Sequence, residues 1–189
     1  MLRMKLIGIA GTNGSGKDTV GHMLADKHGF LFISVSDLLR DECRQRGLPI
    51  ERENLRAISA EWRREGGLGV LIDKAVGAFE HQANQYAGLA VASVRNPGEN
   101  DRVHALDGTM VWVDANPRVR YDRIQSANRG RGTEDTKTYE QFLAEEEAEM
   151  HASGDAATLD MAAVKDLCDI TILNEGSEID LESQINQLA

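Results

Sequence analysis

A glycine-rich stretch near the N-terminus limits what this chain can fold into more than any other feature. Gly11-Thr12-Asn13-Gly14-Ser15-Gly16-Lys17-Asp18-Thr19 follows an apolar run at 6–10 and leads into an amphipathic segment at 20–28. Glycines let successive backbone N–H groups turn toward phosphate oxygens, and the start of the following helix adds positive potential. Lys17 supplies a point charge for β- and γ-phosphates. This strand, turn and helix context predicts a phosphate-binding loop.

The nucleotide contacts predicted for this loop come from Gly11, Asn13, Gly14, Ser15, Gly16, Lys17, Asp18 and Thr19. One position departs from the usual motif, because Asp18 stands where a serine or threonine normally binds Mg²⁺. The hydroxyl comes one residue later, at Thr19. We expect Asp18 and Thr19 to contact the metal. The simpler alternatives are a flexible turn that contains a lysine by chance, and an Asp18 that only stabilises the helix dipole.

Short apolar runs alternate with amphipathic segments along the whole chain, which indicates a single domain over residues 1–189. The predicted strands are 6–10, 30–33, 88–94, 110–113 and 170–173. The predicted helices begin or centre near 20, 34, 55, 71, 99, 117, 138, 158 and 179. Alternation of this kind predicts an α/β fold: a three-layer αβα, doubly wound parallel sheet with right-handed crossovers.

The glycine-rich loop and several polar residues directly follow predicted strands. These residues are Asp37, Arg95 and Asp114. Ligands of doubly wound sheets bind beyond the carboxyl ends of the strands, so we expect these residues to meet in one cleft. Asp114 has a competing role at the start of a helix.

The net charge of −10 is distributed unevenly. Residues 1–131 contain 19 Lys and Arg against 16 Asp and Glu, whereas residues 132–189 contain 2 against 15. The acidic part argues against a nucleic acid polymer as partner, and the arginines suit small phosphorylated ligands. The acidic run Glu145-Glu146-Glu147 is expected to form a solvent-exposed face or an interface, with the former favoured.

Two isolated cysteines, Cys43 and Cys168, indicate a reducing, cytoplasmic setting without disulfides. The apolar runs are all shorter than the ~20 residues of a membrane-spanning helix. We therefore expect a cytoplasmic protein without a membrane partner. Oligomeric state is left open.

The combined motifs resemble the nucleoside monophosphate kinase group of P-loop kinases, including the related dephospho-coenzyme A kinases. The resemblance extends over essentially the whole chain. It is carried by the glycine-rich loop, Ser34-Val35-Ser36-Asp37-Leu38-Leu39-Arg40, the strand ending at Arg95, the helix with Arg120 and Arg123, and Asn174-Glu175-Gly176-Ser177. It implies ATP as donor, Mg²⁺, and a small phosphorylated acceptor.

The resemblance also implies roles for individual residues. Asp37 and Arg40 match the acceptor-binding Asp-x-x-Arg, and Arg95 takes the place of an acceptor-binding arginine. The acceptor region would span about 35–87 and a short lid about 128–137, with Arg129 and Arg131 closing over the transferred phosphoryl group. For Arg40, Arg129 and Arg131, solvent-exposed ion pairs or loop positions are the alternatives.

One departure from the group concerns the central strand. Many of these kinases end it with an aspartate that orders Mg²⁺, but Ala92-Ser93 occupies that stretch here. The function that the resemblance implies is ATP-dependent phosphorylation of a nucleoside or deoxynucleoside monophosphate. A dephospho-coenzyme A kinase or other small-metabolite kinase, with Asp37 as general base, is one alternative. A non-catalytic or switch-like nucleotide-binding protein is another.

Overall fold

The computed structural model describes residues 4–126, 137–151 and 154–188. Its five strands form one parallel sheet in the order β2-β3-β1-β4-β5. Their bounds are β1 Lys5–Ala10, β2 Phe30–Ser34, β3 Gly88–Val94, β4 Thr109–Asp114 and β5 Ile170–Leu173. The chain leaves β1 for β2 on one side and later crosses β1 to reach β4, so the crevice beside β1 is the topological switch point.

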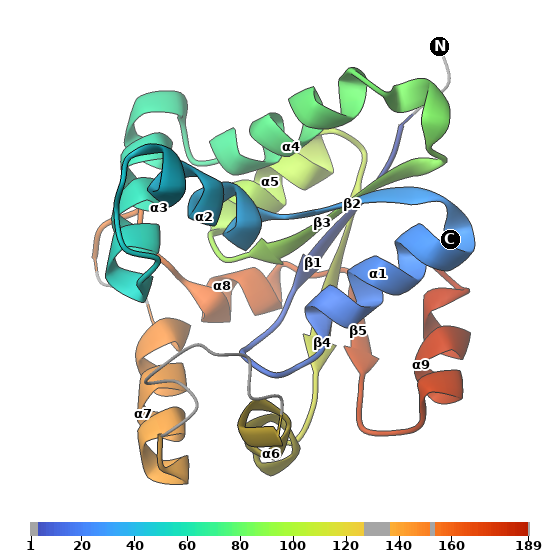
Figure 1. Cartoon of the computed structure of the whole chain (residues 1–189). Helices are drawn as coiled ribbons and strands as arrows, with labels where there is room; N and C mark the ends of the chain where they lie inside the picture. The colour runs from blue at the N-terminus through green and yellow to red at the C-terminus, as the bar shows by residue number, and fades with distance from the viewer. Residues whose placement is uncertain (1–3, 127–136, 152–153, 189) are drawn as a thin grey trace.

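Helices cover both faces of the sheet, as predicted (Figure 1). Their bounds are α1 Lys17–His28, α2 Val35–Gln45, α3 Arg52–Gly66, α4 Val70–Glu80, α5 Pro97–Ala105, α6 Pro117–Ser126, α7 Tyr139–Met150, α8 Met161–Asp166 and α9 Glu178–Ile185, with a 3₁₀ turn, η1, at Ala83–Gln85. The expected three-layer α/β architecture is confirmed.

Two separate cores hold the layers together, because alternate residues of a strand point to opposite faces. From β1, Leu6 and Ala10 enter the core under α2–α5 and α8. Ile7 and Ile9 enter the core under α1 and α9. β3 is buried along its whole length, which explains its continuous small and apolar sequence.

Local capping chemistry sets several helix starts. The helix expected from Glu99 begins two residues earlier, at Pro97, because Asn96 caps it: its Oδ1 accepts from the Gly98 amide at 2.9 Å. The predicted cap of α6 is confirmed, since Asn116 Oδ1 accepts from the Arg118 amide at 2.9 Å. Within the described residues, no helix has the length and apolar character needed to cross a membrane.

Helices α6 and α7 lie beyond the carboxyl end of the sheet (Figure 1). Phe142 packs against Tyr121, with ring centroids 5.8 Å apart, and is the buried residue of α7. Helix α7 therefore borders the edge of the sheet where ligands of this fold bind.

Candidate phosphate-binding cleft

The glycine-rich loop joins β1 to α1 in a conformation that needs glycine. Gly16 has φ +92°, and a Cβ there would lie 2.2 Å from Asn174 Nδ2. Asn174 Nδ2 donates to the Ser15 carbonyl at 2.8 Å, so the residue after β5 supports the loop from outside. Because Gly16 has no side chain to cap α1, the first amides of that helix remain available to an anion.

Polar atoms inside this loop are buried without a protein partner. Within the described part of the chain, Thr12 Oγ1, Ser15 Oγ and Asp18 Oδ1 lack a hydrogen bond. Lys17 is buried and donates to the Thr12 carbonyl at 3.4 Å. Because a buried polar atom without a partner is costly, these orphaned groups fit a loop that is completed by a phosphate and its metal ion.

The loop faces a large open cleft of about 1460 Å³. Loop residues line one side of it, and α2, α3 and the end of β3 line the other. Its basic lining side chains are Lys17, Arg40, Arg44, Arg52, Arg56, Arg63, Arg95, Arg123 and Lys137. The cleft is thus strongly cationic and has room for more than one small ligand.

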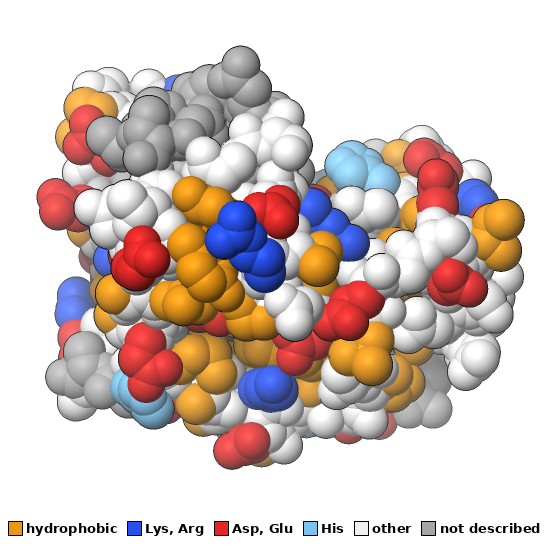
Figure 2. Space-filling model, turned by 90° about the horizontal axis from the view of Figure 1, so that it is seen from below, with side chains coloured by type: hydrophobic (Ala, Val, Ile, Leu, Met, Phe, Trp, Pro, Cys, Tyr) orange, Lys and Arg blue, Asp and Glu red, His pale blue; other side chains and the backbone are white. Residues whose placement is uncertain are grey.

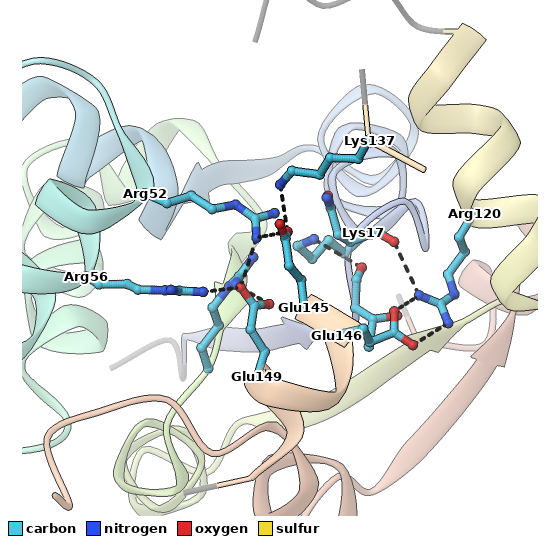
Figure 3. A network of polar contacts seen from close by, with 11 residues as sticks. Lys17, Arg52, Arg56, Arg120, Lys137, Glu145, Glu146 and Glu149 are labelled. Atoms are coloured by element: carbon cyan, nitrogen blue, oxygen red, sulfur yellow. Dashed lines mark hydrogen bonds and ion pairs between the residues drawn. The ribbon is translucent and has the colours of Figure 1, made fainter. Parts of the chain in front are cut away.

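Three arginines meet at one carboxylate in this cleft. Glu149 of α7 accepts from Arg56 at 2.7 Å, from Arg95 at 3.1 Å and from Arg52 at 3.3 Å. Burial alone would raise the pKa of the Glu149 carboxyl, but the charges of Arg95 and Arg52 and the hydrogen bond from Arg56 outweigh it and hold the pKa below its usual value. Figure 3 shows Arg52 and Arg56 both directed at this end of α7.

Two further carboxylates of α7 face cations around the loop (Figure 3). Glu145 pairs with Lys137 at 2.6 Å and Arg52 at 3.2 Å. Glu146 forms a bidentate pair with the buried Arg120, which also donates to the loop carbonyl of Asn13 at 3.4 Å. The expected solvent-exposed face is therefore wrong for Glu146, whose side chain is 19% exposed, whereas those of Glu145 and Glu147 are 42% and 75% exposed.

A buried ion pair fixes the turn that carries Arg95. The Glu99 carboxylate accepts from Arg63 at 2.7 and 3.0 Å, and from the amides of Arg95 at 2.8 Å and Asn96 at 3.2 Å. Arg63 also donates to the Ala157 carbonyl at 2.9 Å. These bonds link α3, α5 and the turn after β3, which holds the backbone of Arg95 at the cleft wall.

Ser93 occupies a strained position at the end of β3. Its φ is +68°, and the register of β1 with β3 passes from Ala92 directly to Val94, so Ser93 is a bulge. Bulges and left-handed non-glycine residues cluster at functional sites, where they redirect a side chain. Ser93 lines the cleft, in the place where the resemblance leads one to expect a carboxylate.

The structure brings most of the predicted site residues together. Asn13, Gly14, Gly16, Lys17, Asp18, Thr19, Arg40 and Arg95 line the cleft. Asp37 and Asp114 do not belong to its described lining: Asp37 is 66% exposed and pairs with Arg40, whereas Asp114 pairs with Lys165 at 3.3 Å. The expected meeting of all strand-end residues is thus only partly met. Arg129 and Arg131 lie outside the described residues.

Sequence reasoning missed Arg52, Arg56, Lys137 and Glu149. The four-residue spacing of Arg52 and Arg56 puts them on one face of α3, and this spacing is the sequence pattern that could have indicated a shared ligand. Within the described residues, no cluster of three or more His, Cys, Asp or Glu side chains could hold a metal by itself.

The surface seen from below mixes both signs of charge (Figure 2). Acidic and basic side chains are interspersed there among hydrophobic ones, with His at two edges.

Comparison with known proteins finds a matching family model and similar proteins in archaea. The model of the AAA domain family matches residues 7–150. A UPF0200 protein of Methanococcus maripaludis is 26% identical over 96% of this chain and 94% of its own length. A UPF0200 protein of Pyrococcus abyssi is 28% identical over 91% of this chain and 88% of its own.

Solved structures share the fold at low sequence identity. Shikimate kinase from Bacteroides thetaiotaomicron aligns with a TM-score of 0.61 and 15% identity, covering 98% of this chain and 96% of that one. A putative kinase from Chloroflexus aurantiacus aligns with a TM-score of 0.59 and 17% identity, covering 99% and 96%. The fold is therefore that of the P-loop small-molecule kinases, as the sequence motifs indicated.

Proposed function

This chain belongs to the AAA domain family, and we propose that it transfers the γ-phosphoryl group of ATP to a nucleoside or deoxynucleoside monophosphate. One observation carries the proposal. A loop with orphaned polar groups and a buried lysine faces, across one cleft, three arginines that converge on a single carboxylate. The first suits a polyphosphate donor and the second a phosphorylated acceptor.

On the donor side, the loop amides and Lys17 hold the β- and γ-phosphates. Ser15 and Thr12 offer hydroxyls that lack a protein partner. Asp18 and Thr19 are the residues that would hold Mg²⁺, because Asp18 Oδ1 is orphaned beside the loop and Thr19 follows it in the first turn of α1. Bound Mg²⁺ supplies charge neutralisation at the donor phosphates.

On the acceptor side, Arg52, Arg56 and Arg95 grip the acceptor's phosphate. Their guanidinium groups present planar pairs of N–H donors, which match phosphate oxygens. An acceptor phosphate is already ionised at neutral pH, so its oxygen attacks without a general base. Apolar side chains of the same cleft, including Val35, Leu39 and Leu55, offer a surface for a base or sugar.

Arg40 belongs to this acceptor side in the proposal, next to α3. Arg129 and Arg131 are assigned to closure over the transferred group, which excludes water. Asp37 is assigned to orienting Arg40, with which it pairs. A hydroxyl acceptor would instead require a base, and the exposure of Asp37 outside the cleft lining weighs against that role in this conformation.

The test is ADP formation with Mg²⁺-ATP and a panel of acceptors. Purified protein is assayed against ribo- and deoxynucleoside monophosphates, and against hydroxyl acceptors such as dephospho-coenzyme A. Acceptor-dependent ADP with at least one monophosphate is expected, and it should vanish in Lys17→Met, which keeps the stem of the buried lysine. Turnover only with hydroxyl acceptors would refute the acceptor class, and slow hydrolysis that no acceptor accelerates would indicate a nucleotide-binding protein without transfer activity.

A further inference from the structure

Helix α7 presents three carboxylates to the cations that surround the phosphate-binding cleft. Glu145, Glu146 and Glu149 together contact Arg52, Arg56, Arg95, Arg120 and Lys137. The five cations exceed the three carboxylates by two charges. Figure 3 shows Arg52 and Arg56 on one side of these carboxylates and Arg120 on the other.

We propose that α7 is an internal anionic ligand of the cleft: its Glu149 occupies the anion position of Arg52, Arg56 and Arg95, and a phosphate of the substrate replaces it. The identity of the substrate in this proposal rests on the proposed function, whereas the exchange of Glu149 for a phosphate does not. The ligand class is a dianionic phosphate monoester. Its three terminal oxygens satisfy more guanidinium N–H groups than the two oxygens of a carboxylate.

The packing of α7 permits such an exchange. Among its twelve residues, Phe142 is buried against the aromatic ring of Tyr121, and Met150 is half-buried against the main core. Elements with few buried apolar contacts open at low free energy, whereas core elements open only on global unfolding. The ion pairs therefore supply part of the free energy that keeps α7 packed on the cleft, and a competing anion reduces that part.

Arg120 shows what the exchange would uncover. Its guanidinium is buried between the Asn13 carbonyl of the loop and Glu146 of α7. Departure of Glu146 would expose a cation held against the phosphate-binding loop by the Ala115 carbonyl at 2.7 Å. One movement of α7 would thus free anion positions on both sides of the cleft.

A charge-neutral substitution with a matched control tests the exchange. Glu149→Gln removes the charge and keeps the shape, and Glu147→Gln makes the same change on the same helix at a side chain that is 75% exposed and pairs with His151. Binding of inorganic phosphate to the full chain is measured by calorimetry, without nucleotide. We expect Glu149→Gln to bind phosphate about tenfold more tightly than wild type, and Glu147→Gln to bind as wild type does.

The opposite outcome has a clear meaning. If Glu149 orients the arginines for the ligand, Glu149→Gln will bind phosphate more weakly or equally well, and the exchange is refuted. Because neither donor nor turnover enters this measurement, its failure is distinct from failure of the acceptor panel.

Hydrogen exchange on the wild-type chain gives a second readout that needs no variant to fold. Saturating phosphate should speed the exchange of α7 amides at 139–150 while slowing that of the first turns of α3. Ligands ordinarily protect the elements that they contact, so faster exchange in α7 is specific to displacement. Unchanged or slower exchange in α7 would overturn the proposal.

Discussion

Breaking the buried pair of Arg63 and Glu99 should destabilise the protein far more than breaking the exposed pair of Arg64 and Asp155. The side chains of Arg63 and Glu99 are 2% and 0% exposed, whereas those of Arg64 and Asp155 are 57% and 44% exposed. Arg63→Met keeps the apolar stem but leaves the Glu99 carboxylate buried with only the Arg95 and Asn96 amides as donors. Removing one partner of a buried pair costs about 3–5 kcal/mol. Arg64→Met breaks an exposed pair, which contributes roughly 0–1 kcal/mol.

Chemical denaturation in urea measures this difference directly, provided that the slope of the transition stays the same for all variants. For a chain of this size, about 3–5 kcal/mol corresponds to a melting temperature lower by roughly 6–20 °C. Adding Glu99→Gln to Arg63→Met should recover part of the loss, because the amide oxygen still accepts from the two backbone N–H groups and no charge is left buried. Equal losses of unfolding free energy in Arg63→Met and Arg64→Met would refute this difference between the buried and the exposed pair.

Three further predictions concern the cleft and the free thiol. Arg95→Ala should raise the KM of the acceptor about tenfold or more and leave the affinity for ATP unchanged. Arg102→Ala, which breaks an exposed pair, should change neither quantity. A selective loss of ATP binding in Arg95→Ala would show that Arg95 contacts the donor. Asp18→Ala should raise the Mg²⁺ concentration that supports nucleotide binding, and Asp26→Ala on the same helix should not. Identical Mg²⁺ titrations would make Asp18 an ordinary first-turn acid. Burial, with a smaller effect of Asp169, raises the pKa of the Cys168 thiol to about 11. Iodoacetamide at pH 8 should therefore label Cys168 roughly a hundredfold more slowly than a free cysteine. Rapid labelling would contradict that pKa.

The layered fold could be predicted because its signals are local. Apolar runs bounded by glycines and caps set the strands, and all five lie where the pattern put them, within one or two residues. The glycine-rich loop was predictable for the same reason, since a strand, a turn and a helix start follow one another directly in the chain. Its supporting contact from Asn174, 159 residues from Ser15, carries no comparable sequence signal.

The arginine cluster could not be predicted, because its members meet only in the folded chain. Glu149 is 93 residues from Arg56 and 54 from Arg95. The sequence reveals the sign of each charge but not its partner. Four-residue spacing aligned Arg52 with Arg56, yet the same spacing is found on many solvent-exposed helices.

The uneven charge of the two parts of the chain has a structural explanation in this cluster. Arginines of the first part and glutamates of α7 in the second meet at the cleft, so part of the asymmetry is internal pairing. A neutral acceptor would not supply the negative charge that Glu149 now gives to Arg56 and Arg95, whose side chains are 48% and 24% exposed. A phosphate would, because it brings at least the charge that it displaces. Under the proposed function, the cleft selects an acceptor first by its charge and then by its shape, and the apolar lining contributed by α2 and α3 selects the base or sugar.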